Sequence, residues 1–182
     1  MGLMTLFLKA EKIVEKTDPR DRETLLSICR DIQDAQRDLL SAGTDIFARC
    51  ITRCGGLCCR NVRADSIFSV WDFVLLLTAE PSLKQMIRRC IEEQQLSRSP
   101  DCIFLLRGEG PCIFPQETRP EMCIVSFCGD DSPIHREINR VKRKFARLAW
   151  FVLLQRFRVI GRSVCRRYGG GRQSPGKHKL IE

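Results

Sequence analysis

Two cysteine-rich stretches decide how the middle of this chain folds. The first reads Cys50-Ile-Thr-Arg-Cys54-Gly-Gly-Leu-Cys58-Cys59-Arg60, and the second runs from Cys102 to Cys128. Thiolates three or four residues apart can converge on one ion from a single turn, and a divalent metal or an iron-sulfur cluster offsets the charge of crowded thiolates. The sequence therefore predicts one or two four-coordinate metal centres. The expected ligands are Cys50, Cys54, Cys58, Cys59, Cys102, Cys112, Cys123 and Cys128.

A disulfide framework is the alternative use of so many cysteines. The cysteine count of 11 is odd, and the segment from Met1 to Ala10 does not read as a cleavable signal. A chain of 182 residues can also bury about two-thirds of its unfolded surface without such staples. These features favour metal binding in a reducing cytoplasm, with free buried thiols as a further alternative.

Positive charge is concentrated at the C-terminal end. The net charge is +9, and the segment from Pro133 onward holds 14 Lys and Arg against 2 acids, which leaves residues 1–132 with 17 against 20. Such a segment suits contact with nucleic acid, an anionic membrane surface or an acidic protein, or it serves solubility. No stretch reaches the roughly 18 consecutive apolar residues of a membrane span, so none is expected.

Apolar residues recur at helical spacing over most of the chain, and caps mark several helix ends. Asp18 and Ser69 are expected to cap helices, and Gly43 to end one in a left-handed conformation. Residues 65–69 are expected to be a short strand or extended stretch. The predicted helices cover Thr5 to Lys16, Pro19 to Ser41, Val70 to Ala79, Pro81 to Leu96, and Pro133 to Arg167.

The second cysteine stretch predicts a compact hairpin or knuckle. Residues 102–106 and 112–114 flank Gly108 and Gly110, and Arg119-Pro120 then bends the chain so that Cys123 can return. The expected fold is mainly α with small irregular or β knuckles, its helices packed around a cysteine-rich metal-binding core. We expect N-terminal helices over 1–44, the cysteine core over 45–130, a basic amphipathic helix over 131–168 and a flexible tail over 169–182.

Three features over residues 45–130 carry a resemblance to a known family. They are the Cys-Gly-x-Cys-Cys-like element from Cys54 to Cys59, the helix start at Trp71-Asp72, and the Cys102 to Cys128 run with its Arg-Pro. The chain resembles the zinc- or iron-chelating cysteine-cluster proteins of the YkgJ (CxxCxxCC) type. The resemblance implies metal binding by these cysteines, with some members described as ferredoxin-like, and implies little about a reaction.

The spacing bears on which metal is bound. Zinc sites commonly use close cysteine pairs, whereas the second stretch has gaps of nine, ten and four residues between its cysteines. Iron-sulfur clusters accept varied spacing and are often shielded by apolar residues. The sequence therefore favours an iron-sulfur cluster, with zinc as the alternative. The candidate shielding residues, which equally suit an ordinary core, are Ile103, Phe104, Phe114, Ile124 and Phe127.

Two functions fit these features. The first is a metal-binding protein that takes part in electron transfer or in metal or redox handling with a protein partner. The second is a zinc-stabilised binding module whose basic helix contacts nucleic acid or an acidic partner, although stacking aromatics are few. No catalytic residue is assigned, because no Ser-His-Asp, Cys-His, paired-carboxylate or phosphate-loop arrangement stands out.

Overall fold

The computed structural model describes residues 2–48, 59, 61–94, 101–106, 111–126 and 130–168, with side chains in the last range described as far as Gln155. Helices account for most of these residues, which confirms the mainly α prediction. Short 3-10 turns occur at Pro81–Leu83, Gln116–Thr118 and Ser132–Ile134. The α-helices are α1 (Leu3–Lys16), α2 (Pro19–Ala42), α5 (Ala64–Ile67), α6 (Val70–Ala79), α7 (Lys84–Gln94), α8 (Glu121–Val125) and α9 (His135–Tyr168).

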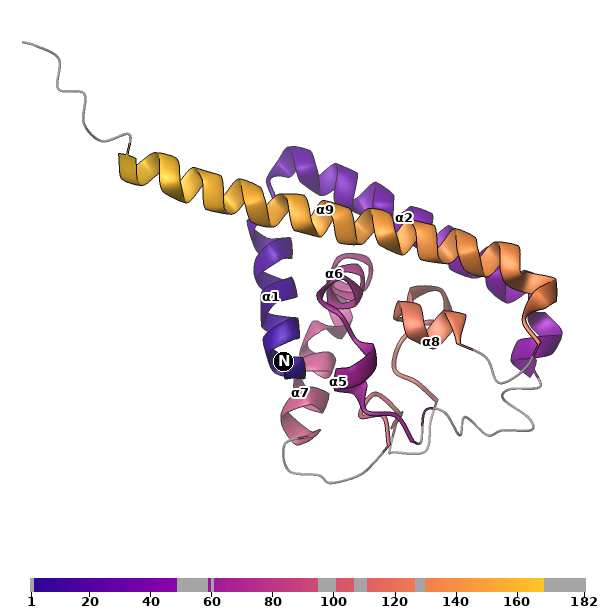
Figure 1. The fold of residues 1–182 in the computed structure, drawn as a ribbon. Helices are drawn as coiled ribbons and strands as arrows, with labels where there is room; N and C mark the ends of the chain where they lie inside the picture. The colour runs from indigo at the N-terminus through magenta and orange to yellow at the C-terminus, as the bar shows by residue number, and fades with distance from the viewer. Residues whose placement is uncertain are drawn as a thin grey trace, which may run out of the picture.

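Helices α2 and α9 lie side by side along one edge of the molecule (Figure 1). Polar contacts fix their register, and residue numbers on α2 fall as those on α9 rise, so the two helices are antiparallel. The contacts, at 2.5 to 3.0 Å, join Arg140 to Asp38, Lys144 and Arg147 to Asp31, and Gln155 to Asp21.

Helix α6 lies at the centre of the fold, where it packs against α1, α2 and α9. Phe73, Val74, Leu75 and Leu76 have no exposed surface, so this helix is buried nearly all round, as its almost uninterrupted apolar sequence requires. We call α1, α2, α6 and α9 the helical scaffold. Its buried side chains form one continuous apolar cluster with Phe104, Phe114 and Ile124 from the second cysteine stretch.

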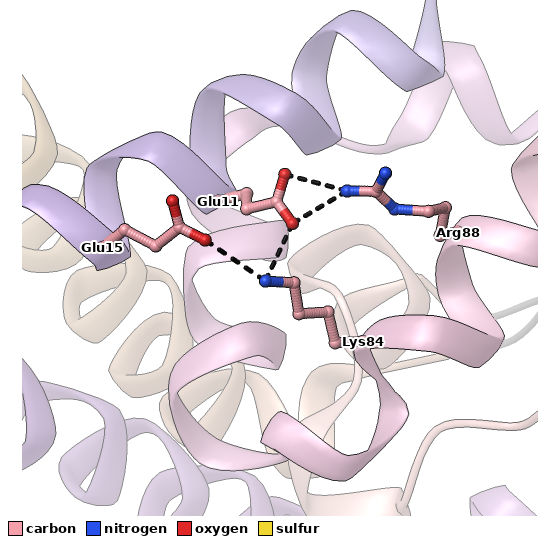
Figure 2. A network of polar contacts seen from close by, with 4 residues as sticks. All are labelled: Glu11, Glu15, Lys84 and Arg88. Atoms are coloured by element: carbon pink, nitrogen blue, oxygen red, sulfur yellow. Dashed lines mark hydrogen bonds and ion pairs between the residues drawn. The ribbon is translucent and has the colours of Figure 1, made fainter.

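Helix α7 is attached to α1 by a network of ion pairs (Figure 2). Lys84 lies between Glu11 and Glu15, with Nζ 2.9 and 3.2 Å from their carboxylate oxygens. Arg88 donates to both oxygens of Glu11 at 2.9 and 3.0 Å, and its guanidinium also lies 5.5 Å from the ring centre of Phe7. The hydrogen bond from Lys84 is the main reason that the pKa of Glu11 lies below its usual range.

Most predicted helices lie within two residues of their expected bounds, and the Ser69 cap is confirmed. The Ser69 side chain accepts from the Asp72 amide, and the Asp72 carboxylate accepts from the Ser69 amide, which is a capping box. Asp18 is the N-cap residue of α2 and Pro19 its first helical residue, as predicted, but the Asp18 side chain makes no capping hydrogen bond. The Asp18 carbonyl accepts the first helical bond from the Arg22 amide at 2.8 Å.

The prediction for residues 65–69 is wrong for most of that segment. Residues 64–67 form α5, and only Phe68 and Ser69 are extended. Local polar contacts explain the turn, since Arg63 pairs with Asp65 at 2.8 Å and the Ser66 hydroxyl donates to the Arg63 carbonyl at 2.7 Å. Asp65 also lies in the first turn of α5, where a negative charge is favourable beside the free amides of a helix.

Gly43 does not adopt the predicted left-handed conformation, because its φ is −102°. The chain turns there and continues helically over residues 44–48. A Cβ at Gly43 would lie 2.9 Å from the ring of Phe47, so the glycine is needed for close approach. None of the described helices is both long and apolar enough to cross a bilayer.

Candidate metal centre

Four of the eight predicted ligands lie in the part of the chain that the structure describes: Cys59, Cys102, Cys112 and Cys123. The other four, Cys50, Cys54, Cys58 and Cys128, and the candidate shielding residue Phe127, lie outside the described residues. We call Cys59 together with residues 101–106 and 111–126 the cysteine-bearing region. No disulfide joins any two of its four cysteines.

The second stretch forms the knuckle that its glycines predict. Leu105 and Cys112 make an isolated antiparallel bridge, and the Ile113 amide donates to the Phe104 carbonyl at 2.9 Å. The Leu106 amide donates to the Pro111 carbonyl, also at 2.9 Å. This pairing places Cys102 and Cys112 on adjacent segments.

The two sides of the knuckle repeat a tripeptide, Cys-Ile-Phe, at residues 102–104 and 112–114. In each copy the phenylalanine amide hydrogen-bonds the thiol two residues before it, which lowers the pKa of that thiol and opposes the effect of burial. The Phe104 and Phe114 rings lie 4.9 Å apart and pack against Phe68. Each copy therefore buries its ring and aims a backbone donor at its sulfur.

Cys123 and Cys59 lie close to the knuckle. The Cys102 amide donates to the Cys59 carbonyl at 2.8 Å, which ties the end of the first cysteine stretch to the start of the second. Burial raises the pKa of the Cys123 thiol most, and nearby Cys102 and Cys112 raise it further because adjacent thiolates repel. Asp72 and Cys59 act in the same direction. The four thiols are thus electrostatic neighbours.

Two buried polar side chains of the helical scaffold fix the bend that delivers Cys123. The Gln36 amide group donates to the Arg119 carbonyl at 2.8 Å and accepts from the Arg119 amide at 3.0 Å. Asp72 accepts from the Glu121 amide at 2.9 Å. Pro120, which has no amide hydrogen to donate, lies between Arg119 and Glu121. Its carbonyl accepts from the Cys123 amide at 3.0 Å.

Asp72 has a second role, because the same carboxylate completes the cap of α6. It is 2 % exposed, and burial raises its pKa. Hydrogen bonds from Ser69 and from the Glu121 amide oppose that shift by stabilising the charged form. This residue, which the sequence marks only as part of a helix start, joins the N-terminal ends of α6 and α8.

Arg119 places a positive charge beside the knuckle, where it lowers the pKa of Cys112 against the larger opposing effect of burial. Its Nε is buried and has no hydrogen-bond partner in the described part of the chain. A buried guanidinium donor without an acceptor is costly, so its position suits a negatively charged sulfur. Together with the thiol donor set, this orphaned donor fits a metal-thiolate centre.

The described side chains do not by themselves form a finished metal site. Among them, no three Cys, His, Asp or Glu side chains are grouped so that they could hold one metal ion. Burial raises the pKa of Cys102 to about 11, so its thiol is protonated near neutral pH. Burial raises the pKa of Cys112 and Cys123 as well, so these thiols are also protonated near neutral pH.

Two further cysteines differ in where they lie, one in the apolar core and one near the candidate site. Cys29 on α2 is 2 % exposed and burial raises its pKa to about 12, so it belongs to the apolar core. Cys90 on α7 was not predicted to belong to the site, yet it lies close enough to Cys102 to raise the pKa of that thiol. In the sequence, the only sign that Cys90 lies near the site is its place three residues after Ile87 and directly before Ile91, which are both buried.

No family model, curated protein or solved structure matches this chain. The resemblance to the YkgJ type thus stays a prediction from the sequence.

Proposed function

We propose that this protein binds a metal ion or an iron-sulfur cluster through cysteine thiolates of its two cysteine stretches. The observation that carries the proposal is the repeated Cys-Ile-Phe knuckle, in which a backbone amide is aimed at each of two adjacent thiols. Hydrogen bonds to cysteine sulfur stabilise the thiolate that a metal requires and tune the potential of iron-sulfur clusters.

The neighbours of the knuckle support the same function. Cys123 and Cys59 add two thiols near the knuckle. Because the described thiols alone are not grouped closely enough to hold a metal ion, the proposed centre would draw on cysteines of both stretches. Arg119 supplies a buried donor and a positive charge that offset the negative charge of such a centre. A bound cluster would supply one-electron chemistry, and bound zinc would supply structural cross-linking.

Iron-sulfur remains the favoured occupant, because the knuckle packs on a wall of aromatic rings. Phe68, Phe104 and Phe114 contact one another, with ring centres 4.9 to 5.9 Å apart, and Phe104 and Phe114 are at most 3 % exposed. Such a wall limits water at one side of a cluster. On this basis we propose electron transfer or metal and redox handling in the cytoplasm, with a redox or acidic protein as partner.

Anaerobic purification, followed by metal analysis and an absorption spectrum, tests the proposal. We expect zinc or iron at about one or two centres per chain. Cys123→Ala should lose that metal, whereas Cys29→Ala, the same truncation of another buried thiol, should keep it. Absence of both metals with the cysteines paired in disulfides, or equal metal loss from both variants, would contradict the proposal.

The nucleic-acid alternative relies on the basic face of α9, and part of that face is already engaged. Arg140, Lys144 and Arg147 pair with aspartates of α2, so these charges fix helix packing. A zinc-stabilised module that contacts nucleic acid or an acidic partner therefore has fewer available cations than the sequence suggests.

A further inference from the structure

The side of α9 that faces away from the core has an unusual composition. The core side carries Ile138, Val141, Phe145, Leu148 and Val152, each at most 2 % exposed. The opposite side, which we call the outer face, has a basic half and an apolar half. The basic half is Arg136 and Arg143, with Lys142 on its flank, where it interacts electrostatically with Glu121 of α8, and the apolar half is Trp150, Leu153 and Leu154.

The apolar half is a ridge with no cover in the described part of the chain. Trp150 is 64 % exposed, and Leu153 and Leu154 are 40 % and 41 % exposed. Their spacing of three and four residues places them together on the helix surface. Single exposed apolar residues are ordinary, but a grouped tryptophan and two leucines indicate a surface that becomes covered.

The basic half lies N-terminal to the apolar half on the same side, with Arg143 about two turns before Trp150. Its two arginines and Lys142 line a shallow, open hollow together with His135, Asn139 and Ala146. Arg136 and Arg143 form no ion pair with any described acid, in contrast to Arg140, Lys144 and Arg147, which are bound to α2. The hollow therefore offers guanidinium groups suited to a phosphate or carboxylate.

Charge decides between the occupants of this face. Helix α9 contains 11 Lys and Arg against one acid, so pairing with a second copy would bring like charges together. Nucleic acid would use the cations, but it gains nothing from a leucine ridge, and Trp150 is the one exposed aromatic on the described part of this face. Basic residues beside exposed Trp and Leu on one helix are typical of helices that lie in the surface of an anionic membrane.

We propose that the outer face of α9 docks on the surface of an anionic phospholipid bilayer. The apolar half enters the boundary between headgroups and acyl chains, and the basic half binds lipid phosphates. In this orientation α9 lies against the bilayer, and α5 and α7 lie toward the opposite edge of the molecule (Figure 1). The docked state spans nothing and leaves the core side of α9 packed as it is.

Flotation of the full chain, purified anaerobically, with lipid vesicles tests this proposal. The probes are vesicles of phosphatidylcholine alone and vesicles with about one-third phosphatidylglycerol, at low and moderate salt. We expect binding to the anionic vesicles that weakens with salt, and little binding to the neutral ones. Arg136→Gln with Arg143→Gln should weaken binding about tenfold or more, since each cation near the surface adds attraction.

Two further variants make the test specific to the outer face. Arg140→Gln with Arg147→Gln removes the same charge from cations that are bound to α2, and it should weaken vesicle binding only about two- to threefold. Leu153→Gln with Leu154→Gln should weaken binding at both salt concentrations, because the apolar contribution is not screened. Circular dichroism confirms that each variant is folded.

Several outcomes would overturn the proposal. They are equal loss in the two arginine pairs, equal binding to neutral and anionic vesicles, and no vesicle binding at low salt. Tight binding to duplex DNA or RNA without vesicle binding would assign the face to nucleic acid. A dimer in light scattering that Leu153→Gln with Leu154→Gln dissociates would assign it to a second copy.

Discussion

The helical scaffold and the cysteine-bearing region are stabilised in different ways. The scaffold buries long apolar helix faces, as in α6, where Phe73 and Leu76 have no exposed surface. In the cysteine-bearing region α8 has only 5 residues, and the knuckle has a single bridge. Its position depends on backbone hydrogen bonds that Gln36 and Asp72 of the scaffold accept.

The difference shows how a segment too short to fold alone can be ordered. A few apolar residues and one bridge do not offset the entropy of fixing such a chain, so the segment needs buried partners or a metal. The scaffold supplies the buried partners, and binding of the proposed metal would supply the rest of the free energy that orders the segment. Perturbations should therefore divide into those that reach both regions and those that reach the cysteine-bearing region alone.

The largest expected effect is that of pH on metal affinity. Burial raises the pKa of Cys102 to about 11 and also raises that of Cys112 and Cys123, so these thiols are protonated at neutral pH and must lose protons to bind metal. Zinc affinity should rise with pH by about tenfold per unit for each coordinating thiol, and should fall as the pH is lowered from 8 to 6.

Calorimetry of zinc binding in two buffers with different ionisation enthalpies measures the protons released. We expect about one proton per coordinating thiol. Far-ultraviolet circular dichroism of the metal-free protein should stay constant over the same pH range, because the scaffold does not depend on these thiols. Zinc binding without proton release would contradict the assignment of the buried thiols as ligands.

A cavity in the scaffold should destabilise both regions. Phe73→Ala removes a fully buried ring that contacts Phe7 and Phe68, with ring centres 5.7 and 5.2 Å away. The free energy of unfolding should fall by about 3–5 kcal/mol, and metal content should fall with it. Chemical denaturation followed by circular dichroism checks this, and an unchanged midpoint would show that α6 is not the centre of the core.

Removal of the hydrogen bonds between Gln36 and the Arg119 backbone should affect mainly the cysteine-bearing region. Gln36→Leu keeps the volume of this fully buried side chain but leaves the Arg119 amide and carbonyl without partners. We expect a loss of stability of about 2 kcal/mol and weaker metal binding, with helix content unchanged. Gln33→Leu, a matched change at a half-buried residue with one 3.2 Å side-chain contact to Thr118, should have little effect on metal affinity.

The smallest expected effect is that of the ion pairs between α1 and α7. The pKa of Glu11 is lowered from its ordinary value near 4.5, so its stabilising contribution is complete above that value and is lost as the pH falls through the folded-state pKa. Glu11→Gln should cost under about 1 kcal/mol at pH 7 and nothing at low pH. Thermal unfolding of both proteins at pH 7 and pH 3 measures the difference.

The helices of this fold could be predicted because their signals are local. The apolar periodicity of α2 and α9 and the Ser69 cap lie within a few residues of the elements that they specify. The knuckle was predictable for the same reason, since its glycines lie between the paired segments. The turn at α5 has no comparable signal, because four residues are too few to show a helical period.

The parts of the candidate site that were missed depend on long-range contacts. Gln36 and Arg119 are 83 residues apart, and Asp72 and Glu121 are 49 apart. A polar side chain that holds a distant backbone has no periodicity or spacing that would reveal it. Cys90 was missed because a cysteine on the buried side of a helix resembles an ordinary core residue.

The hydrogen bonds of Gln36 with Arg119 and of Asp72 with Glu121, on either side of Pro120, also bear on the order in which the molecule folds. Contacts between residues far apart in sequence close large loops, and they form late when local helices can form first. The amides of Arg119 and Glu121 should therefore become protected from hydrogen exchange after those of α2 and α6. Pulse-labelling during refolding measures this order. The helices of a nascent chain would then be complete before its thiols come close together. The finished scaffold would hold the thiols in their native places as soon as they meet, which leaves little time for incorrect disulfides to form.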